Sequence, residues 1–280
     1  MKAGSEVSVR KAFDLCFVGL VYLFSSLIFL PLIAIFVYMV MKGLPALSFD
    51  LLTHLPRPVG SEYSGISNAI VGSLILIAIA SLIAVPLGIL IGIHLYEYKQ
   101  ARMTDILRLC MDVLQGVPSI IVGIVVYVWV VLPLNSFSAL SGGIALALMM
   151  LPVIARSTEE TMNLILPTYK EAALALGVPY YTAVFKVVLR SAGSGVLTGI
   201  VLSVARIAGE TAPLLFTAFG NQFMSYNVFK PILALPLLIF NYATSPYEEW
   251  QAIAWGAALL LILFIFMLSI GVKLLSYEKK

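Results

Sequence analysis

The feature that most constrains this chain is the recurrence of long stretches without a charged residue. An uncharged apolar run of about 18 or more residues can cross a lipid bilayer as a single helix. Residues 15–41, 69–93 and 250–272 each form such a run. Each of the three is therefore expected to be one transmembrane helix.

The longest uncharged run, residues 113–155, has to cross the bilayer twice. As one continuous helix it would be about 65 Å long, roughly twice the thickness of a hydrocarbon core. Pro133, with Asn135 and Ser136 after it, interrupts the apolar pattern near the middle of the run. A further apolar segment, residues 191–219, contains two charged residues and supplies the sixth predicted span.

The sequence thus predicts an all-α integral membrane protein with six transmembrane helices. The predicted spans are residues 13–41, 66–94, 113–132, 140–155, 191–219 and 250–272. The last five belong to a core that covers residues 66–275. The segments expected outside the spans are a tail at 1–12, an outer loop at 42–65, a cytoplasmic loop at 156–190 and a tail at 276–280.

The distribution of basic residues predicts the orientation of the spans. Cytoplasmic loops of membrane proteins are enriched in lysine and arginine. If the N-terminus lies inside, most of the 17 lysines and arginines fall in cytoplasmic segments, and only Lys42, Arg57 and Lys230 fall in outer loops. Both termini are therefore expected to be cytoplasmic.

Composition excludes several classes of protein. Hydrophobic residues make up 61% of the chain and charged residues 11%, which does not suit a water-soluble enzyme. The net charge of +3 and the lack of a basic run argue against nucleic-acid binding. The histidines and the two cysteines have no metal-ligand spacing, so no metal site is expected. No phosphate-binding glycine loop and no set of catalytic residues within the spans is found, so we expect neither ATP hydrolysis nor another catalytic activity in this chain.

The predicted cytoplasmic loop contains legible helix signals. Thr168 and Glu171 have the spacing of a capping box, with Thr168 as the N-cap, and Gly177 suits a left-handed C-cap. The short helix between them would present alanine and leucine side chains on a loop that lies in the cytoplasm. An apolar surface in that place usually binds a protein partner.

Arg206 and Glu210 are unusual because they fall inside a predicted span. A charge in the middle of a span costs on the order of 3 kcal/mol even on the most lenient scale, so its presence has to be compensated. The two residues are four apart and could pair on one helix face, as a purely structural ion pair. A role in a translocation path is the preferred interpretation, since arginine before glutamate is the less favourable order for such a pair. Gly209 and Pro213 flank the pair and would permit a bend or hinge.

The residues of the loop carry a resemblance to a known family. Glu171, Ala172 and Ala173, followed at fixed distances by Gly177 and then by Val187 and Leu189, resemble the E-A-A loop of ABC importer permeases. Arg190 stands where that family usually has proline. The stretches 205–216 and 86–98 are similar to phosphate importer permeases, and the resemblance extends over residues 65–277.

The resemblance implies a type I ABC importer permease in the bacterial inner membrane. Such a subunit pairs with a homologous permease subunit, two cytoplasmic ATPase subunits and an extracytoplasmic phosphate-binding protein, and the family is linked to a phosphate-signalling regulator. ATP and Mg²⁺ would be used by the partner ATPase, and no cofactor is expected on this subunit. The residues expected to couple it to the ATPase are Glu171, Ala172, Ala173, Leu174 and Gly177.

Phosphate as the substrate would give the intramembrane charges a chemical purpose. A guanidinium stays charged and can bind two oxyanion oxygens at once, so Arg206 is expected on the substrate pathway, with Glu210, Thr211 and Arg156 beside it. Glu210 could accept the proton that phosphate keeps near neutral pH and sulfate lacks. For Arg156, a position near a cytoplasmic helix end also suits a simple positively charged anchor.

Two alternatives remain for the function. An ABC permease for sulfate or molybdate would share the E-A-A loop and differ in residues 205–216. A secondary anion transporter could also use Arg206 and Glu210, but it would often have two similar halves, and no internal repeat is found.

Overall fold

The computed structural model describes residues 2–61 and 64–277, and the regular elements in these ranges are helical. The longer helices are α1 (Lys2–Gly43), α3 (Ser67–Glu97), α4 (Arg102–Gly116), α7 (Ala139–Asn163), α11 (Gly193–Ala208) and α14 (Glu248–Tyr277). The shorter ones are η1 (Leu44–Ala46), α2 (Phe49–Thr53), α5 (Ser119–Val126), the π-helix η2 (Tyr127–Val131), α6 (Leu132–Leu134), α8 (Pro167–Ala175), α9 (Tyr180–Thr182), the π-helix η3 (Ala183–Val188), α10 (Leu189–Ser191), α12 (Ala212–Leu215) and α13 (Leu235–Ala243).

The described chain has four helices that are long and apolar enough to cross a membrane alone, within α1, α3, α7 and α14. Two bent pairs raise the number to the predicted six if each pair is one span. The pair Arg102–Gly116 and Ser119–Leu134 bends by 107°, and the pair Tyr180–Ser191 and Gly193–Ala208 bends by 69°.

The segment predicted as the span 113–132 contains a helix break near its start. Val113 belongs to α4, an amphipathic helix that ends at Gly116, and the apolar helix starts after Pro118. Proline forces the residue before it into an extended conformation, and Val117 has φ −72° and ψ 131°. The turn at the end of this span is where the sequence placed it, since Asn135 adopts a left-handed conformation and Ser138 caps α7.

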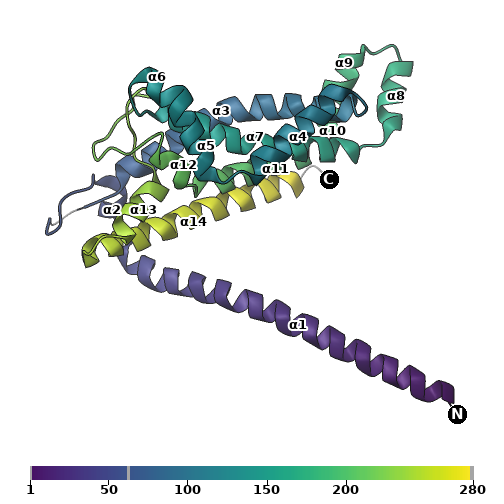
Figure 1. Cartoon of the computed structure of the whole chain (residues 1–280), viewed down its shortest axis with the longest axis horizontal. Coiled ribbons are helices and arrows are strands. Elements are labelled where there is room, and N and C mark those ends of the chain that lie inside the picture. The colour runs from purple at the N-terminus through teal and green to yellow at the C-terminus, as the bar shows by residue number, and fades with distance from the viewer. Residues whose placement is uncertain (1, 62–63, 278–280) are drawn as a thin grey trace.

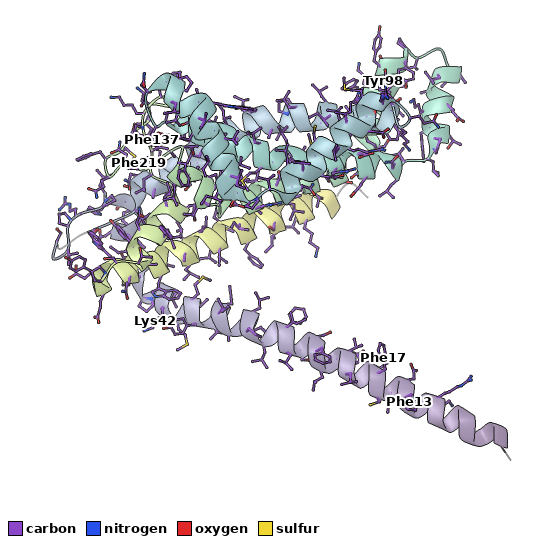
Figure 2. The ribbon with its side chains drawn as sticks, viewed as in Figure 1. Phe13, Phe17, Lys42, Tyr98, Phe137 and Phe219 are labelled. Atoms are coloured by element: carbon purple, nitrogen blue, oxygen red, sulfur yellow. The ribbon has the colours of Figure 1, made fainter. Side chains whose placement is uncertain are left out.

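Two further helices end at residues other than the ends of the predicted spans. Helix α7 does not end at residue 155 but continues to Asn163, because its last turns still have buried positions such as Thr158 and Met162. The predicted span 191–219 ends at Ala208 instead, and the chain then turns so that Phe219 stacks on Phe137, with ring centroids 4.7 Å apart. Figure 2 shows these two rings side by side at one end of the bundle.

Helices α3, α7 and α11 pack closely along rows of small residues. A Cβ added at Gly88 or Gly92 of α3 would lie within 2.8 Å of Ile154 or Thr158 of α7. A Cβ at Gly199 of α11 would lie 2.1 Å from the Ser157 hydroxyl oxygen. Small residues four apart let membrane helices approach at backbone distance, which explains why these three helices form the centre of the bundle.

Helix α1 stands apart from this bundle. It contacts α14 near its C-terminal end, where Tyr38 packs edge-on against Trp255, and its apolar side chains are otherwise exposed. Figure 1 shows α1 projecting away from the bundle, and Figure 2 shows Phe13 and Phe17 on the projecting part and Lys42 at the junction. The C-terminal end of α14 points toward the end of the bundle that carries α8 (Figure 1).

Candidate translocation and coupling sites

Arg206 and Glu210 lie on either side of a helix end. Arg206 is in the last turn of α11, which ends at Ala208, while Glu210 lies in the short link before α12. Helix cannot continue here, because Pro213 would clash with the carbonyl of Gly209 four residues earlier. The backbone opening expected at Gly209 and Pro213 is therefore present.

The ion pair between Arg206 and Glu210, the structural alternative to a pathway role, is not formed. The helix end removes Glu210 from the helix face of Arg206, and no salt bridge in the described part of the chain involves either residue. The Arg206 side chain is exposed, whereas Glu210 and Thr211 are half-buried. An exposed guanidinium at an open helix end is free to bind an anion from outside this chain, which an internal ion pair would prevent.

Helix α12 is fixed in place by α5. A Cβ added at Gly123 of α5 would lie 2.7 Å from the Cα of Pro213 and 3.0 Å from its carbonyl oxygen. Pro213 and Leu214 are buried in this contact. The segment that follows Glu210 is thus packed closely against α5. At Gly209, by contrast, an added Cβ would meet nothing within 4 Å.

Arg156 takes part in a network of four charges between α4 and α7. Its guanidinium donates to Asp112 Oδ1 at 2.5 Å and to Glu159 Oε2 at 3.3 Å. Arg108 donates to Glu159 Oε1 at 2.6 Å. The Glu159 side chain is 7% exposed and is neutralised by both arginines. The sequence had indicated a position after the end of the helix, but Arg156 lies inside α7. Its ion pair with Asp112 holds α4 against α7.

The sequence analysis missed Arg108, Asp112 and Glu159. Arg108 and Asp112 are four apart on α4, and Glu159 follows Arg156 by three residues, so each pair shares a helix face. These two spacings were visible in the sequence. Their pairing across helices was not, because α4 was not predicted as a helix.

The short helix α8 begins differently from the prediction. Its N-cap is Leu166 with Pro167 in the first turn, and the side chain of Thr168 forms no cap, so the predicted capping box is absent. Proline at this place needs no hydrogen bond for its nitrogen, which makes it a competing start signal. The predicted end is correct: Gly177 has φ +80°, and Val178 N–H donates to the Ala173 carbonyl at 3.2 Å.

Helix α8 has an outer and an inner face. Glu171, Ala172 and Ala175 are exposed together on the outer face. Ala173 is 9% exposed and lies on the inner face with Lys170. The sequence had indicated that Ala173 belongs to the exposed surface, and the structure shows that it does not. Leu174 is 37% exposed at the border between the two faces. The side chains of Leu164, Leu166, Tyr169 and Leu176, in and next to α8, are also exposed.

The inner face of α8 is tied to the end of α3 by polar contacts. Lys170 Nζ donates to Glu97 Oε2 at 2.5 Å and to the Tyr180 hydroxyl at 3.1 Å. The Tyr180 hydroxyl donates to the same Glu97 oxygen. Burial lowers the pKa of Lys170, but the hydrogen bonds to Glu97 and Tyr180 outweigh burial, so that its pKa is raised and the amine stays charged. Neither Glu97 nor Lys170 was singled out from the sequence.

No group of three or more histidine, cysteine, aspartate or glutamate side chains that could bind a metal ion is found within residues 2–61 and 64–277. The exposed Cys16 and Cys110 are both free thiols.

Comparison with known proteins places residues 84–277 within a family. The profile of that family, described as "Binding-protein-dependent transport system inner membrane component", matches this range. A phosphate transport system permease protein PstA from Xylella fastidiosa (strain 9a5c) is 43% identical over 244 residues, covering 86% of this chain and 85% of the relative. The protein of the same name from Haemophilus influenzae is 40% identical over 272 residues and covers 97% and 96%.

The fold is shared with a solved transporter. An inward-facing structure of the MetNI methionine ABC transporter includes a chain that matches with a TM-score of 0.62 and 16% identity, covering 77% of this chain and 94% of that one.

A probable phosphate transport system permease protein PstA from the archaeon Methanocaldococcus jannaschii is 37% identical over 267 residues. The likeness in sequence therefore extends beyond bacteria.

Proposed function

The chain belongs to the family of binding-protein-dependent transport system inner membrane components, and from that premise we propose that it is the permease subunit of an ATP-driven importer of inorganic phosphate. The observation that carries the proposal is the 40% identity to a phosphate permease over almost the whole of both chains. Identity of that extent includes the spans, the α11–α12 break and α8 alike.

The outer face of α8 is proposed as the docking surface for the ATPase subunit. Glu171, Ala172 and Ala175 form an exposed patch on a short helix that is stopped by Gly177. Leu176, 84% exposed, adds an apolar side chain that water solvates poorly. A protein surface with a matching groove would cover these groups, and the movement of the ATPase would then act on α8.

The break between α11 and α12 is proposed as part of the phosphate pathway. Arg206 is exposed and has no internal salt bridge, so its guanidinium is available to bind two oxygens of phosphate. Glu210, half-buried on the other side of Gly209, would accept the phosphate proton and Thr211 would donate or accept a further hydrogen bond. In this proposal Arg156 acts through Asp112 and Glu159, as a residue that holds α4 and α7 together.

The proposed complex contains other subunits. A second, homologous permease subunit would complete the pathway, because Arg206 faces outward from this chain. Two cytoplasmic ATPase subunits would bind ATP and Mg²⁺, an extracytoplasmic binding protein would deliver phosphate, and this subunit would bind no cofactor. Both termini would lie in the cytoplasm with α8.

Radiolabelled phosphate uptake tests the proposal in cells that lack their own permease subunit and carry its partners. We expect wild type to restore uptake, with excess sulfate or molybdate not competing. Arg206→Gln should lower uptake at least about tenfold while the ATPase still co-purifies, since one charge-assisted contact to an anion contributes about 1.5–3 kcal/mol. Glu171→Lys should lower uptake by weakening ATPase binding.

Matched controls use exposed residues of the same type. Arg190→Gln and Glu160→Lys change charge on exposed positions of α10 and α7 and should keep uptake at the wild-type level. Full uptake in Arg206→Gln would contradict its place on the pathway. Competition by sulfate or molybdate would point to another oxyanion. Loss of phosphate-over-sulfate selectivity in Glu210→Gln is expected, and unchanged selectivity would remove the proton-acceptor role.

A further inference from the structure

The contact between α8 and α3 is made by a compact polar cluster, defined here as Glu97, Lys170 and Tyr180. Glu97 is the last residue of the transmembrane helix α3, Lys170 lies on α8, and Tyr180 begins α9. The cluster therefore joins the end of α3 to the neighbouring helices α8 and α9, whose residues Lys170 and Tyr180 are 73 and 83 residues from Glu97 in the sequence. Figure 2 shows Tyr98, the residue after Glu97, close to the end of the bundle that carries α8 and α9.

Burial of the two charged members makes this cluster more costly to break than a surface ion pair, while the Tyr180 side chain is partly exposed. The Glu97 side chain is 4% exposed and that of Lys170 is 19% exposed. Glu97 Oε2 accepts hydrogen bonds from both Lys170 and Tyr180, while Oε1 is buried and has no hydrogen-bond partner in the described residues. A buried carboxylate with one oxygen unsatisfied depends on its remaining contacts, because water does not replace them.

Lys170 is held by aromatic rings as well as by charge. Its Nζ lies 4.5 Å from the centroid of the Tyr180 ring and 5.8 Å from that of the Tyr96 ring. A cation over two ring faces has little freedom to swing away. The amine is thus fixed between the end of α3 and the start of α9.

The position of Lys170 on α8 determines what the cluster transmits. Lys170 precedes Glu171 directly, so the inner face carries the cluster while the outer face carries the proposed ATPase-docking patch. Any displacement of α8 by a partner moves Lys170 with it, and the buried carboxylate of Glu97 has to follow or lose its counter-charge. Helix α8 otherwise packs against η3, on the way to α11.

We propose that the Glu97–Lys170–Tyr180 cluster is the linkage through which movement of α8 reaches the transmembrane helix α3, with Lys170 and Tyr180 as positioning residues. This inference rests on the proposed function, since it assumes that α8 receives the ATPase. Helix α3 packs along its length on α7 through Gly88 and Gly92. The linkage thus leads from the docking surface into the centre of the bundle.

The test compares transport and ATP hydrolysis in the complete complex, reconstituted in vesicles with its binding protein. The key variant is Glu97→Gln with Lys170→Met, which removes both charges and leaves no buried unpaired charge. We expect it to assemble and to hydrolyse ATP in response to substrate at the wild-type rate. Phosphate taken up per ATP should fall about fivefold, the effect of a change of about 1 kcal/mol in coupling.

Single variants and neighbouring residues complete the design. Tyr180→Phe removes one hydroxyl from the cluster and should lower uptake per ATP in the same direction, whereas Tyr181→Phe, on an exposed neighbour, should not. Lys186→Met, at an exposed lysine, is the control for the Lys170→Met change within the double variant. Wild-type uptake per ATP in the double variant would overturn the linkage, and so would a parallel loss of hydrolysis and uptake. If the wild-type complex moves no phosphate, the proposed function fails instead.

Discussion

At the scale of single residues, buried charge decides how helices are joined. Glu159 is almost fully buried and accepts hydrogen bonds from Arg108 of α4 and from Arg156 of its own helix. Each arginine is about a quarter to a third exposed, so water solvates the guanidinium groups but not the carboxylate. The carboxylate is thus the member of the network on which the other contacts depend.

Replacing Glu159 with glutamine is expected to destabilise the protein. The amide cannot neutralise two arginines, and removing one partner from a buried ion pair costs about 3 kcal/mol at the lower end of measured values. Thermal unfolding of the purified complex in detergent should show a lower midpoint. The adjacent exposed residue supplies the control, since Glu160→Gln should leave the midpoint unchanged. Equal midpoints for both variants would mean that the network contributes nothing to stability.

The role of a charged side chain was predictable where it follows from the charge itself. It was less predictable where it depends on the residue at which a helix ends. That Arg206 is costly inside a span follows from its charge alone. Its separation from Glu210 could have been foreseen, because Pro213 forbids a hydrogen bond and crowds the carbonyl at Gly209. The four-residue spacing allowed a structural ion pair as the alternative to a pathway role, and the helix end at Ala208 separates the two residues so that this pair is not formed.

At the scale of elements, the contact between α5 and α12 positions the broken helix. Because a Cβ at Gly123 would meet the backbone of Pro213 at 2.7 Å, no side-chain rotation can relieve the clash. The close approach fixes the far side of the break at Gly209. The pathway proposed around Arg206 therefore depends on a glycine in another helix.

Gly123→Ala is expected to push α12 away from α5. Overpacking of this kind costs about 1–3 kcal/mol, so the unfolding midpoint should fall and phosphate uptake with it. Gly116→Ala is the matched control, because a Cβ there meets nothing within 4 Å. If Gly123→Ala keeps full stability and uptake, the α5–α12 contact does not position the break.

Helix ends were the least predictable part of the elements. Uncharged length located α3 and α14 closely, and for α14 both ends of the run are marked by charges, Glu249 and Lys273. Within residues 113–155 the absence of charge concealed the break at Pro118, and α7 continued past its first charge because Thr158 and Glu159 remain buried against neighbours. Charge marks the edge of a membrane segment, whereas packing decides where a helix stops.

At the scale of the whole molecule, long-range partners could not be read from the sequence. Lys170 and Glu97 are 73 residues apart, and Arg108 and Glu159 are 51 apart. The membrane-spanning character of the long helices and the short helix α8 were predictable from local signals, but which helices meet depends on close approach at positions such as Gly88 and Gly92. The separate course of α1 also follows from tertiary contacts alone.

The direction of α1 is set at one glycine. A Cβ at Gly43 would lie 2.7 Å from the Trp255 carbonyl oxygen and 2.9 Å from Leu259 Cβ of α14. From this junction α1 projects away from the bundle with its apolar surface exposed (Figure 1). An apolar helix of this length is covered by lipid or by another membrane subunit.

Gly43→Val is expected to turn α1 relative to α14 and to weaken assembly with the second permease subunit. The clash involves backbone, so α1 has to move as a unit, while the core of α3, α7 and α11 lies elsewhere. Less of the second subunit should co-purify, and the unfolding midpoint of the core should change little. Gly271→Val, where a Cβ meets nothing within 4 Å, is the control on α14. Unchanged co-purification in Gly43→Val would show that lipid alone covers α1.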